Sequence, residues 1–220
     1  MTDGETQAKR RKTKRKVRDP ERTRARILAA AKAAFADRGL GGARVDQIAA
    51  RAKVNKRMIY HYFRSKDGLF LAVLEGAYAD IREAEQTLDL DHLDPVEAIK
   101  TLVAFTWNYY LKNPEFLRLV NSENLHGGRH LAKSEIIRDL HSPFVQMVAD
   151  ILARGERSGV FRKGVDPVQL NITIAALGYY YLTNRHTLSI IFDRDLMAPK
   201  ALSARLDFMI DNVLDTLKPE

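Results

Sequence analysis

The chain has 220 residues, of which 45% are hydrophobic and 29% are charged, a composition typical of a folded globular protein rather than a disordered one. It contains no cysteine, which excludes disulfide bonds, thiolate metal sites and cysteine nucleophiles. The net charge of +8 indicates a polyanionic partner. This charge is unevenly placed, because residues 1–66 carry 20 Lys and Arg against 6 Asp and Glu, whereas residues 67–220 carry 16 against 22.

The first 18 residues predict a flexible basic arm. Eight of the ten positions from 9 to 18 are Lys or Arg, and such a segment buries too little apolar surface to order itself. Its charge suits DNA phosphates or a minor groove, and a solubilising tail is the alternative. No apolar stretch follows these charges, as a secretory signal would require. The most apolar run, residues 172–182, is shorter than the roughly 20 residues that cross a bilayer, so we expect a cytoplasmic protein without a membrane partner.

Signals for helix starts recur along the rest of the chain. Residues 19–21 (DPE) combine a capping acceptor, a proline suited to the first turn and an acid at the positive end of the helix dipole. Gly39 is expected to end this helix. Two short helices are predicted over residues 45–52 and up to about residue 63, followed by a long helix over residues 67–88.

Proline again marks most of the helix starts in the second half of the chain. Further helices are expected to begin near the following residues: Pro95, Pro114, Ser134, Pro167 and Pro199. No segment alternates apolar and polar residues as a strand would, and no Asn-Gly hairpin turn is present. The sequence therefore predicts an all-α fold of about nine helices.

The two short helices and the tight turn between them predict a helix-turn-helix, the unit that places its second helix in a DNA major groove. Helical spacing puts five cationic or hydrogen-bonding residues on one face of the second helix: Lys56, Arg57, Tyr60, His61 and Arg64. The apolar residues Ile59 and Phe63 fall mostly on the other face. An ordinary amphipathic helix is the alternative, but the preceding helix and the basic arm favour contacts with phosphates and base edges.

Four stretches resemble the N-terminal domain of the TetR-type (tetracycline-repressor-like) transcriptional regulators. They are residues 27–31 (ILAAA), 35–39 (FADRG), 45–49 (VDQIA) and 59–69 (IYHYFRSKDGL). The last is the most specific, because an aromatic cluster followed by Ser-Lys and an acid rarely arises by chance in that order. The all-helical remainder of the chain is also similar to this family in size and helix number.

The resemblance implies a helix-turn-helix DNA-binding domain over residues 19–66, of three helices, and a helical effector-binding and dimerisation domain over residues 67–220. It implies, with the pattern above, DNA contacts by seven residues: Arg44, Asn55, Lys56, Arg57, Tyr60, His61 and Lys66. The chain departs from the family at two positions. Lys53 stands at the turn, where a small residue is usual, and a left-handed turn would strain a lysine by roughly 1 kcal/mol. Ala43 stands where a threonine usually caps the first short helix and contacts phosphate, so we expect Arg44 to replace that contact.

Two apolar stripes in the last long helices, over about residues 167–188 and 200–217, suggest a dimer surface. The first stripe comprises Ile172, Ile174, Ala175, Ala176, Leu177 and Gly178. The second comprises Leu202, Leu206, Met209, Ile210, Val213, Leu214 and Leu217. Packing inside one protomer is the alternative for either stripe, but together they resemble the four-helix dimer interface of the family.

Aromatic residues with interspersed polar ones in the middle of the chain are typical of a small-molecule site. The residues predicted to line an effector pocket are Phe105, Trp107, Asn108, Tyr110, Phe116, Glu123, Asn124, His130, Tyr179 and Tyr180. A position in the core is the alternative for most of these aromatic side chains. No cofactor is expected.

The spacing of His126 and His130 beside Glu123 is loosely similar to a metal-binding helix, but Gly127 and Gly128 would break that helix. No Ser/His/Asp signature, glycine-rich phosphate loop or dinucleotide fingerprint is present, so we expect neither a metal site nor an enzyme. The resemblance implies a ligand-responsive transcriptional regulator, most often a repressor. It would bind a near-palindromic double-stranded DNA operator as a homodimer and be released by a small-molecule effector. The alternative is an architectural DNA-binding protein indifferent to sequence.

Overall fold

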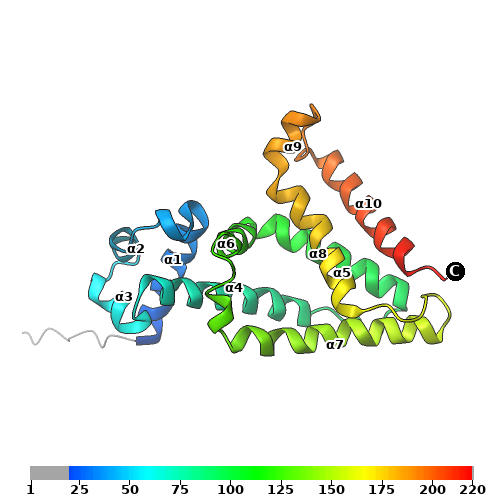
Figure 1. The fold of residues 1–220 in the computed structure, drawn as a ribbon, viewed down its shortest axis with the longest axis horizontal. Coiled ribbons are helices and arrows are strands. Elements are labelled where there is room, and N and C mark those ends of the chain that lie inside the picture. Colours follow the sequence, from blue (N-terminus) through cyan, green and yellow to red (C-terminus); the bar gives the residue numbers. More distant parts are fainter. Residues whose placement is uncertain (1–19, 220) are drawn as a thin grey trace, which may run out of the picture.

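The computed structural model describes residues 20–219, so the predicted basic arm and the cap at Asp19 lie outside the described residues. Within that range the chain forms ten α-helices, one short 3-10 helix and no strand, which confirms the all-α prediction (Figure 1). The helices are α1 (Pro20–Gly42), α2 (Val45–Arg51), α3 (Lys56–Phe63), α4 (Lys66–Gln86), α5 (Pro95–Lys112), α6 (Pro114–Leu125), η1 (Leu131–Lys133), α7 (Ile136–Arg157), α8 (Pro167–Thr183), α9 (Arg185–Ile191) and α10 (Pro199–Leu217).

The helix that was not predicted separately is α9. The sequence suggested one helix over residues 167–188, but α8 ends at Thr183 and the backbone leaves helical geometry at Asn184, with φ −103° and ψ 7°. The Asn184 side chain donates to the carbonyl of Tyr180 at 2.9 Å, which satisfies a carbonyl in the last turn of α8. The apolar pattern continues through this break, and periodicity alone therefore did not reveal it.

Helices α1, α2 and α3 form one end of the molecule together with the start of α4 (Figure 1). Their shared core contains Ile27, Phe35, Ile48 and Ile59, all with no exposed surface. The helix break predicted at Gly39 is confirmed, because its φ of 65° lies in the left-handed region and separates a last short turn from the main part of α1.

Helix α4 leads from this end into the larger helical body (Figure 1). It begins at Lys66, one residue earlier than the start predicted at Asp67, because the Ser65 hydroxyl caps it by accepting a hydrogen bond from the N–H of Gly68 at 2.9 Å. A side chain at Gly68 would not fit, since its Cβ would lie 2.2 Å from the carbonyl oxygen of Phe63. The end of α3 and the start of α4 are thus in close backbone contact.

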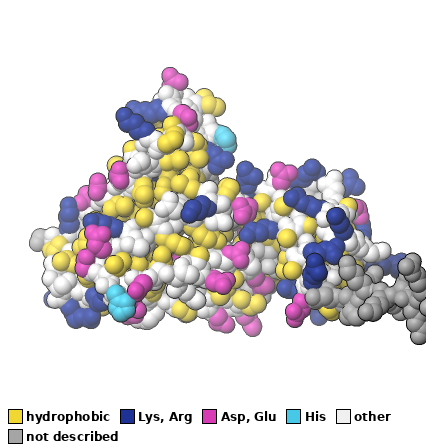
Figure 2. All heavy atoms as spheres, turned by 180° about the vertical axis from the view of Figure 1, so that it is seen from behind, with side chains coloured by type: hydrophobic (Ala, Val, Ile, Leu, Met, Phe, Trp, Pro, Cys, Tyr) yellow, Lys and Arg dark blue, Asp and Glu magenta, His cyan; other side chains and the backbone are white. Residues whose placement is uncertain are grey.

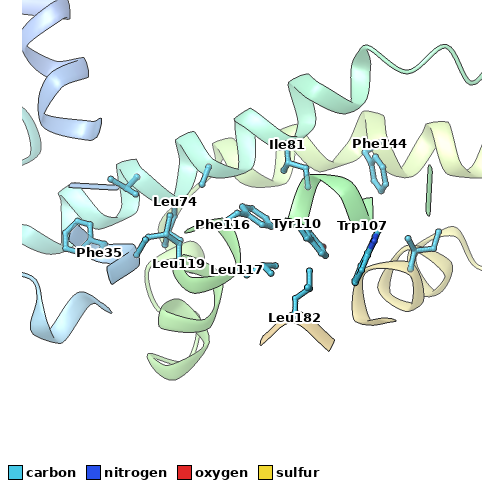
Figure 3. Packing of buried hydrophobic residues seen from close by; sticks show 14 of the residues in the cluster. Phe35, Leu74, Ile81, Trp107, Tyr110, Phe116, Leu117, Leu119, Phe144 and Leu182 are labelled. Atoms are coloured by element: carbon cyan, nitrogen blue, oxygen red, sulfur yellow. The ribbon is translucent and has the colours of Figure 1, made fainter. Parts of the chain in front are cut away.

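The body is built by α4 to α8 and α10 around one continuous core (Figure 3). Large side chains near its centre include Trp107, Tyr110 and Phe116, each less than a tenth exposed. Arg154 of α7 holds the segment between α4 and α5, because its guanidinium donates to the carbonyls of Leu90, Asp91 and Leu93 at 2.7–2.8 Å.

Helices α8, α9 and α10 protrude from the body with α9 at the tip (Figure 1). Three members of the apolar stripe on α10, Met209, Val213 and Leu217, have no exposed surface within the single protomer. Ile174 and Gly178 of α8 are buried as well. For these five residues the structure therefore shows packing inside the protomer. No helix among residues 20–219 combines the length and the apolar character needed to cross a membrane.

Candidate DNA interface and ligand cavity

The second short helix of the helix-turn-helix, α3, is fixed by a cap and by two buried side chains. The side-chain oxygen of Asn55 accepts from the N–H of Arg57 at 2.9 Å, so this residue has a structural role at the helix start. Ile59 and Phe63 are buried beneath the helix. The side chains of Lys56, Arg57, Tyr60 and His61 are exposed, as the helical pattern predicted.

The turn before α3 adopts the left-handed conformation expected for it, with Lys53 at φ 52°. The guanidinium of Arg26, on α1, donates to the carbonyls of Ala52 and Lys53. This contact satisfies carbonyls at the end of α2 and fixes the turn from outside the motif. Sequence reasoning missed Arg26, because nothing in the spacing of α1 indicates which loop its side chain reaches.

Two further predicted contact residues lie at helix N-termini beside α3. Arg44, and not Ala43, is the N-cap residue of α2; its side chain makes no capping hydrogen bond and is exposed. Ala43 is buried at 2% exposure, which corrects the capping position by one residue. Lys66 is the first residue of α4, and its Nζ donates to the carbonyl of Gly41 at 3.3 Å. Figure 2 shows Lys and Arg side chains gathered at this end of the molecule.

One cation of the α3 surface is paired within the protein. Lys56 Nζ lies 2.8 Å from Oδ1 of Asp46 on α2. This hydrogen bond, followed by the attraction of the two charges, raises the pKa of Lys56 and lowers the pKa of Asp46. Arg64, which the spacing placed on the same face, instead caps the end of α3 with φ 64°, because its backbone has already left the helix.

A cavity of about 320 Å³ lies among α4, α5, α6, α7 and α8. It is lined by Tyr78, Ile81, Arg82, Glu85, Thr106, Tyr110, Phe116, Val120, His141, Asn171, Ile172, Ala175, Ala176 and Tyr179. Three of the ten residues predicted for an effector pocket, Tyr110, Phe116 and Tyr179, are among them. Figure 3 shows Tyr110 and Phe116 adjacent in the core, and their rings stack with centroids 6.0 Å apart.

The other seven predicted pocket residues do not line this cavity. Trp107 is 2% exposed and packs edge-on against Tyr181 at 5.7 Å. Four lie at the surface or only partly buried: Phe105, Asn108, Asn124 and Tyr180. The remaining two, Glu123 and His130, are buried against each other. Neighbouring residues of one helix face different partners, and the sequence did not show which partner helices enclose the cavity.

The Glu123–His130 pair closes the loop after α6. One carboxylate oxygen of Glu123 lies 2.6 Å from Nδ1 of His130, and the other accepts from the N–H groups of His130 and Leu131 at 2.7 and 3.0 Å. Burial would raise the pKa of Glu123, but the hydrogen bonds from Leu131 and His130 lower it below its usual value. Among the described residues no group of three or more His, Asp or Glu side chains is arranged to hold a metal ion.

The cavity wall contains a buried ion pair that sequence reasoning missed. Nη2 of Arg82 lies 2.9 Å from Oε1 of Glu85, one turn further along α4, and their side chains are 10% and 4% exposed. The guanidinium also lies over the Phe144 ring, 4.1 Å from its centroid. Burial raises the pKa of Glu85 from 4.5 to about 7, although the charge of Arg82 opposes this, and burial lowers the pKa of Arg82. In the sequence the pair is an ordinary i, i+3 arrangement, usual on solvated helix faces.

Both parts of the chain are similar to known proteins. Residues 27–73 match the family described as bacterial regulatory proteins, tetR family, and residues 95–213 match the tetracyclin repressor-like C-terminal domain. The chain is 42% identical to the HTH-type transcriptional repressor NicS of Pseudomonas putida, over 94% of this chain and 98% of that protein. It is 35% identical to the HTH-type transcriptional repressor SCO4008 of Streptomyces coelicolor, over 73% and 79% of the two chains.

A solved structure extends this similarity to the fold. The transcriptional regulator SCO4942 from Streptomyces coelicolor matches with a TM-score of 0.66 and 26% identity, over 90% of this chain and 99% of that one. The helix-turn-helix at one end and the matching helical body agree with this similarity. The chain therefore belongs to the TetR family, whose members are DNA-binding transcriptional regulators and not enzymes.

Proposed function

We propose that the protein is a ligand-responsive repressor that binds a near-palindromic operator as a homodimer and leaves it when a small molecule occupies the cavity. Residues 19–66 would form the DNA-binding domain and residues 67–220 the effector-binding and dimerisation domain. The observation that carries the proposal is that two helices, α4 and α6, each line the cavity and also contact the helix-turn-helix end. Because the proposed ligand is chromosomal DNA, we place the protein in the cytoplasm.

The contact between α6 and α1 supports the coupling. Phe116 and Val120 of α6 line the cavity. Two residues after Val120, the Ser122 hydroxyl accepts a hydrogen bond from the N–H of Leu40 at 3.2 Å, directly after the break in α1 at Gly39. A ligand that shifts α6 would thus displace the end of α1 and the spacing of the two α3 helices. A coupling free energy of about 1–3 kcal/mol would change operator affinity by roughly 5–150-fold.

The protruding helices support the homodimer. Val168, Ile172 and Tyr180 of α8 are spaced by multiples of four residues and are 44%, 52% and 61% exposed, and Phe208 of α10 is 54% exposed. Figure 2 shows apolar side chains gathered along the protruding helices. A contiguous exposed apolar stripe usually marks an interface, and a two-fold dimer would present two α3 helices to the two halves of a palindrome.

Selection of bound sequences from random DNA duplexes tests the DNA-binding proposal. We expect recovery of a near-palindrome with half-sites about 34–36 Å apart or more. Affinity for it should exceed affinity for random DNA by at least about 10³ at physiological salt. Equal affinity for both would support the alternative of an architectural DNA-binding protein. Repeating the selection with candidate effectors should reduce recovery of the same site.

The individual contacts are tested on the selected site. Arg57→Ala and Tyr60→Phe should weaken operator binding more than random-DNA binding, because these side chains are proposed to reach base edges. Arg44→Ala and Lys66→Ala should weaken operator binding and random-DNA binding alike. Each should reduce the slope of log affinity against log salt concentration (the salt slope) by about one ion. Arg157→Ala, at the exposed far end of α7 (Figure 1), is the control and should change neither. Deleting residues 1–18 should also reduce the salt slope if the arm contacts phosphates.

The dimer is tested by placing charges in the exposed stripe. Tyr180→Lys combined with Phe208→Lys should shift the sedimentation coefficient from dimer to monomer and weaken operator binding. Leu125→Lys is a suitable control, because Leu125 is an 86% exposed apolar residue at the end of α6, outside the stripe. A double variant that remains dimeric would contradict the proposed interface.

A further inference from the structure

The ion pair in the cavity wall has hydrogen-bonding capacity that the protein does not use. Nη2 of Arg82 binds Oε1 of Glu85, but Nε and Nη1 of Arg82 and Oε2 of Glu85 are buried without a hydrogen-bond partner among the described residues. Buried polar atoms in proteins are nearly always paired. Two donor atoms of Arg82 and one acceptor atom of Glu85 are thus unpaired in the residues that line the cavity. They point to a bound molecule that forms the missing hydrogen bonds.

The rest of the cavity is suited to a flat ring. The rings of Tyr78 and Phe116 meet edge to face at 5.5 Å, and the Phe116 ring stacks with Tyr110. The volume of about 320 Å³ lies at the lower end of the roughly 300–1,000 Å³ usual for ligand pockets, which suits a compound of one or two rings.

His141 contributes one hydrogen-bond acceptor to the lining of the cavity. Its Nδ1 lies 2.7 Å from the carbonyl oxygen of Ile137, so Nδ1 carries the proton in this hydrogen bond. Burial lowers the pKa of His141, which favours the neutral ring. The neutral ring with a protonated Nδ1 has its lone pair on Nε2, and this atom is an acceptor.

We propose that the effector, whose existence rests on the function proposed above, is a small planar ring compound that presents an oxygen acceptor to Arg82 and an adjacent N–H or O–H donor to Glu85. A pure hydrocarbon ligand would leave all three unused atoms of the pair unsatisfied. A simple carboxylate would satisfy Arg82 but place a second negative charge beside Glu85. A neighbouring acceptor and donor on one edge of a ring match both side chains.

Calorimetric titration of the full chain without DNA tests this ligand class with four compounds. 2-Pyridone has a carbonyl oxygen beside a ring N–H, N-methyl-2-pyridone lacks the donor, benzoate offers only acceptors, and toluene offers neither. We expect 2-pyridone to bind best and N-methylation to reduce its affinity by about tenfold or more, because a hydrogen bond to a charged group is lost. Tighter binding of benzoate, or no binding of any of the four at millimolar concentration, would overturn the proposal.

A double variant separates the polar contribution from the size of the methyl group. Arg82→Met with Glu85→Leu removes both polar edges at similar volume, and replacing a buried ion pair in this way is often tolerated by the fold. The affinity ratio of 2-pyridone to N-methyl-2-pyridone should fall close to one. The matched control is Lys100→Met with Glu97→Leu, an i, i+3 pair on α5 that is outside the cavity and 40% and 52% exposed, which should keep the original ratio. An unchanged ratio in the Arg82 and Glu85 variant would refute the proposal.

Operator binding, measured separately, distinguishes this inference from the proposed function. If 2-pyridone binds with the expected selectivity but leaves operator affinity unchanged, the ligand class stands and release by an effector at this site is refuted. If the operator is released equally well by toluene or N-methyl-2-pyridone, release by an effector stands and the ligand class is refuted.

Discussion

The carboxylate of Glu123 lies 2.6 Å from Nδ1 of His130, and both side chains are only 2% exposed. The same carboxylate accepts the N–H groups of His130 and Leu131. It thereby fixes the loop containing Gly127 and Gly128 against the end of α6. His130 in turn meets the ring of Phe70 on α4 edge to face at 5.1 Å. One buried acid thus joins α6 to the part of α4 nearest the DNA-binding end.

Glu123→Gln should lower the free energy of unfolding by about 1–3 kcal/mol at pH 7, because a charged acceptor of buried hydrogen bonds is lost. The folded-state pKa of Glu123 is lowered from 4.5, so its ionised form stabilises the fold above that pH and the benefit is lost as the pH falls through the lowered value. Urea denaturation from pH 7 to pH 3 should show the difference between the two proteins shrinking in acid. Glu115→Gln, on the same helix but 34% exposed, should change stability little at any pH. A difference independent of pH would contradict the role of the charge.

Asp46→Asn should strengthen binding to random DNA and make it more salt-dependent. Asp46 holds Lys56 at 2.8 Å, and phosphates must compete with it for this cation. Without the carboxylate, the slope of log affinity against log salt should increase by up to about one ion. Asp37→Asn removes the same charge from an exposed pair with Arg38 and controls for net charge. An equal gain in both variants would show that the Asp46–Lys56 contact itself has no role.

Local signals predicted the helix starts well. Asp94 and Asp166 each accept N–H groups of the following turn and precede a proline at the first helical position, as the sequence indicated. These signals act within four residues and need no knowledge of the fold. The left-handed turn at Lys53 was likewise predictable, because the helix-turn-helix geometry demands it whatever residue stands there.

Features that depend on packing between distant helices were not predictable. Arg82 and Glu85 have the spacing of a surface pair, and only the enclosure of α4 by its neighbours buries them. Arg154 likewise gave no sign of its three carbonyl partners in the segment before α5. The aromatic residues were correctly expected in the body, but which of them face a cavity depends on how α5, α6 and α8 pack together.

Lys53→Gly should raise the free energy of unfolding by about 1 kcal/mol, because a left-handed conformation strains a residue with a Cβ atom and does not strain glycine. The φ of Lys53 is 52°. Lys53→Ala is the matched control, since it removes the same charge and keeps the Cβ atom. It should therefore give no gain in urea denaturation. Both variants should weaken DNA binding equally if the Lys53 charge contributes to it, and equal stability of the two would contradict the strain.

Glu85→Gln should remove a pH dependence of stability. The pKa of Glu85 is raised by burial from 4.5 to about 7, so between these values the folded state binds a proton more readily than the unfolded state. The free energy of unfolding should therefore fall as pH rises through this window, by at most about 1.4 kcal/mol per pH unit. The variant should lack this slope in denaturation measured from pH 4.5 to pH 8. Glu83→Gln, on the exposed side of the same helix, should retain it; an identical slope in all three proteins would show that Glu85 does not titrate in this range.

Gly68→Ala should destabilise the DNA-binding end, whereas Gly76→Ala in the same helix should not. A Cβ at Gly68 would lie 2.2 Å from the carbonyl oxygen of Phe63, whereas nothing lies within 4 Å of one at Gly76. Relieving the clash must move α3 away from α4, at a cost of about 1–3 kcal/mol, and must displace the face that carries Arg57. Gly76→Ala should stabilise α4 by up to about 1 kcal/mol. Relative to the wild type, the thermal unfolding temperature should therefore fall in Gly68→Ala and rise in Gly76→Ala. Operator affinity should be lost only in Gly68→Ala. Full operator affinity in that variant would mean that the close contact of α3 with α4 does not set the position of the recognition surface.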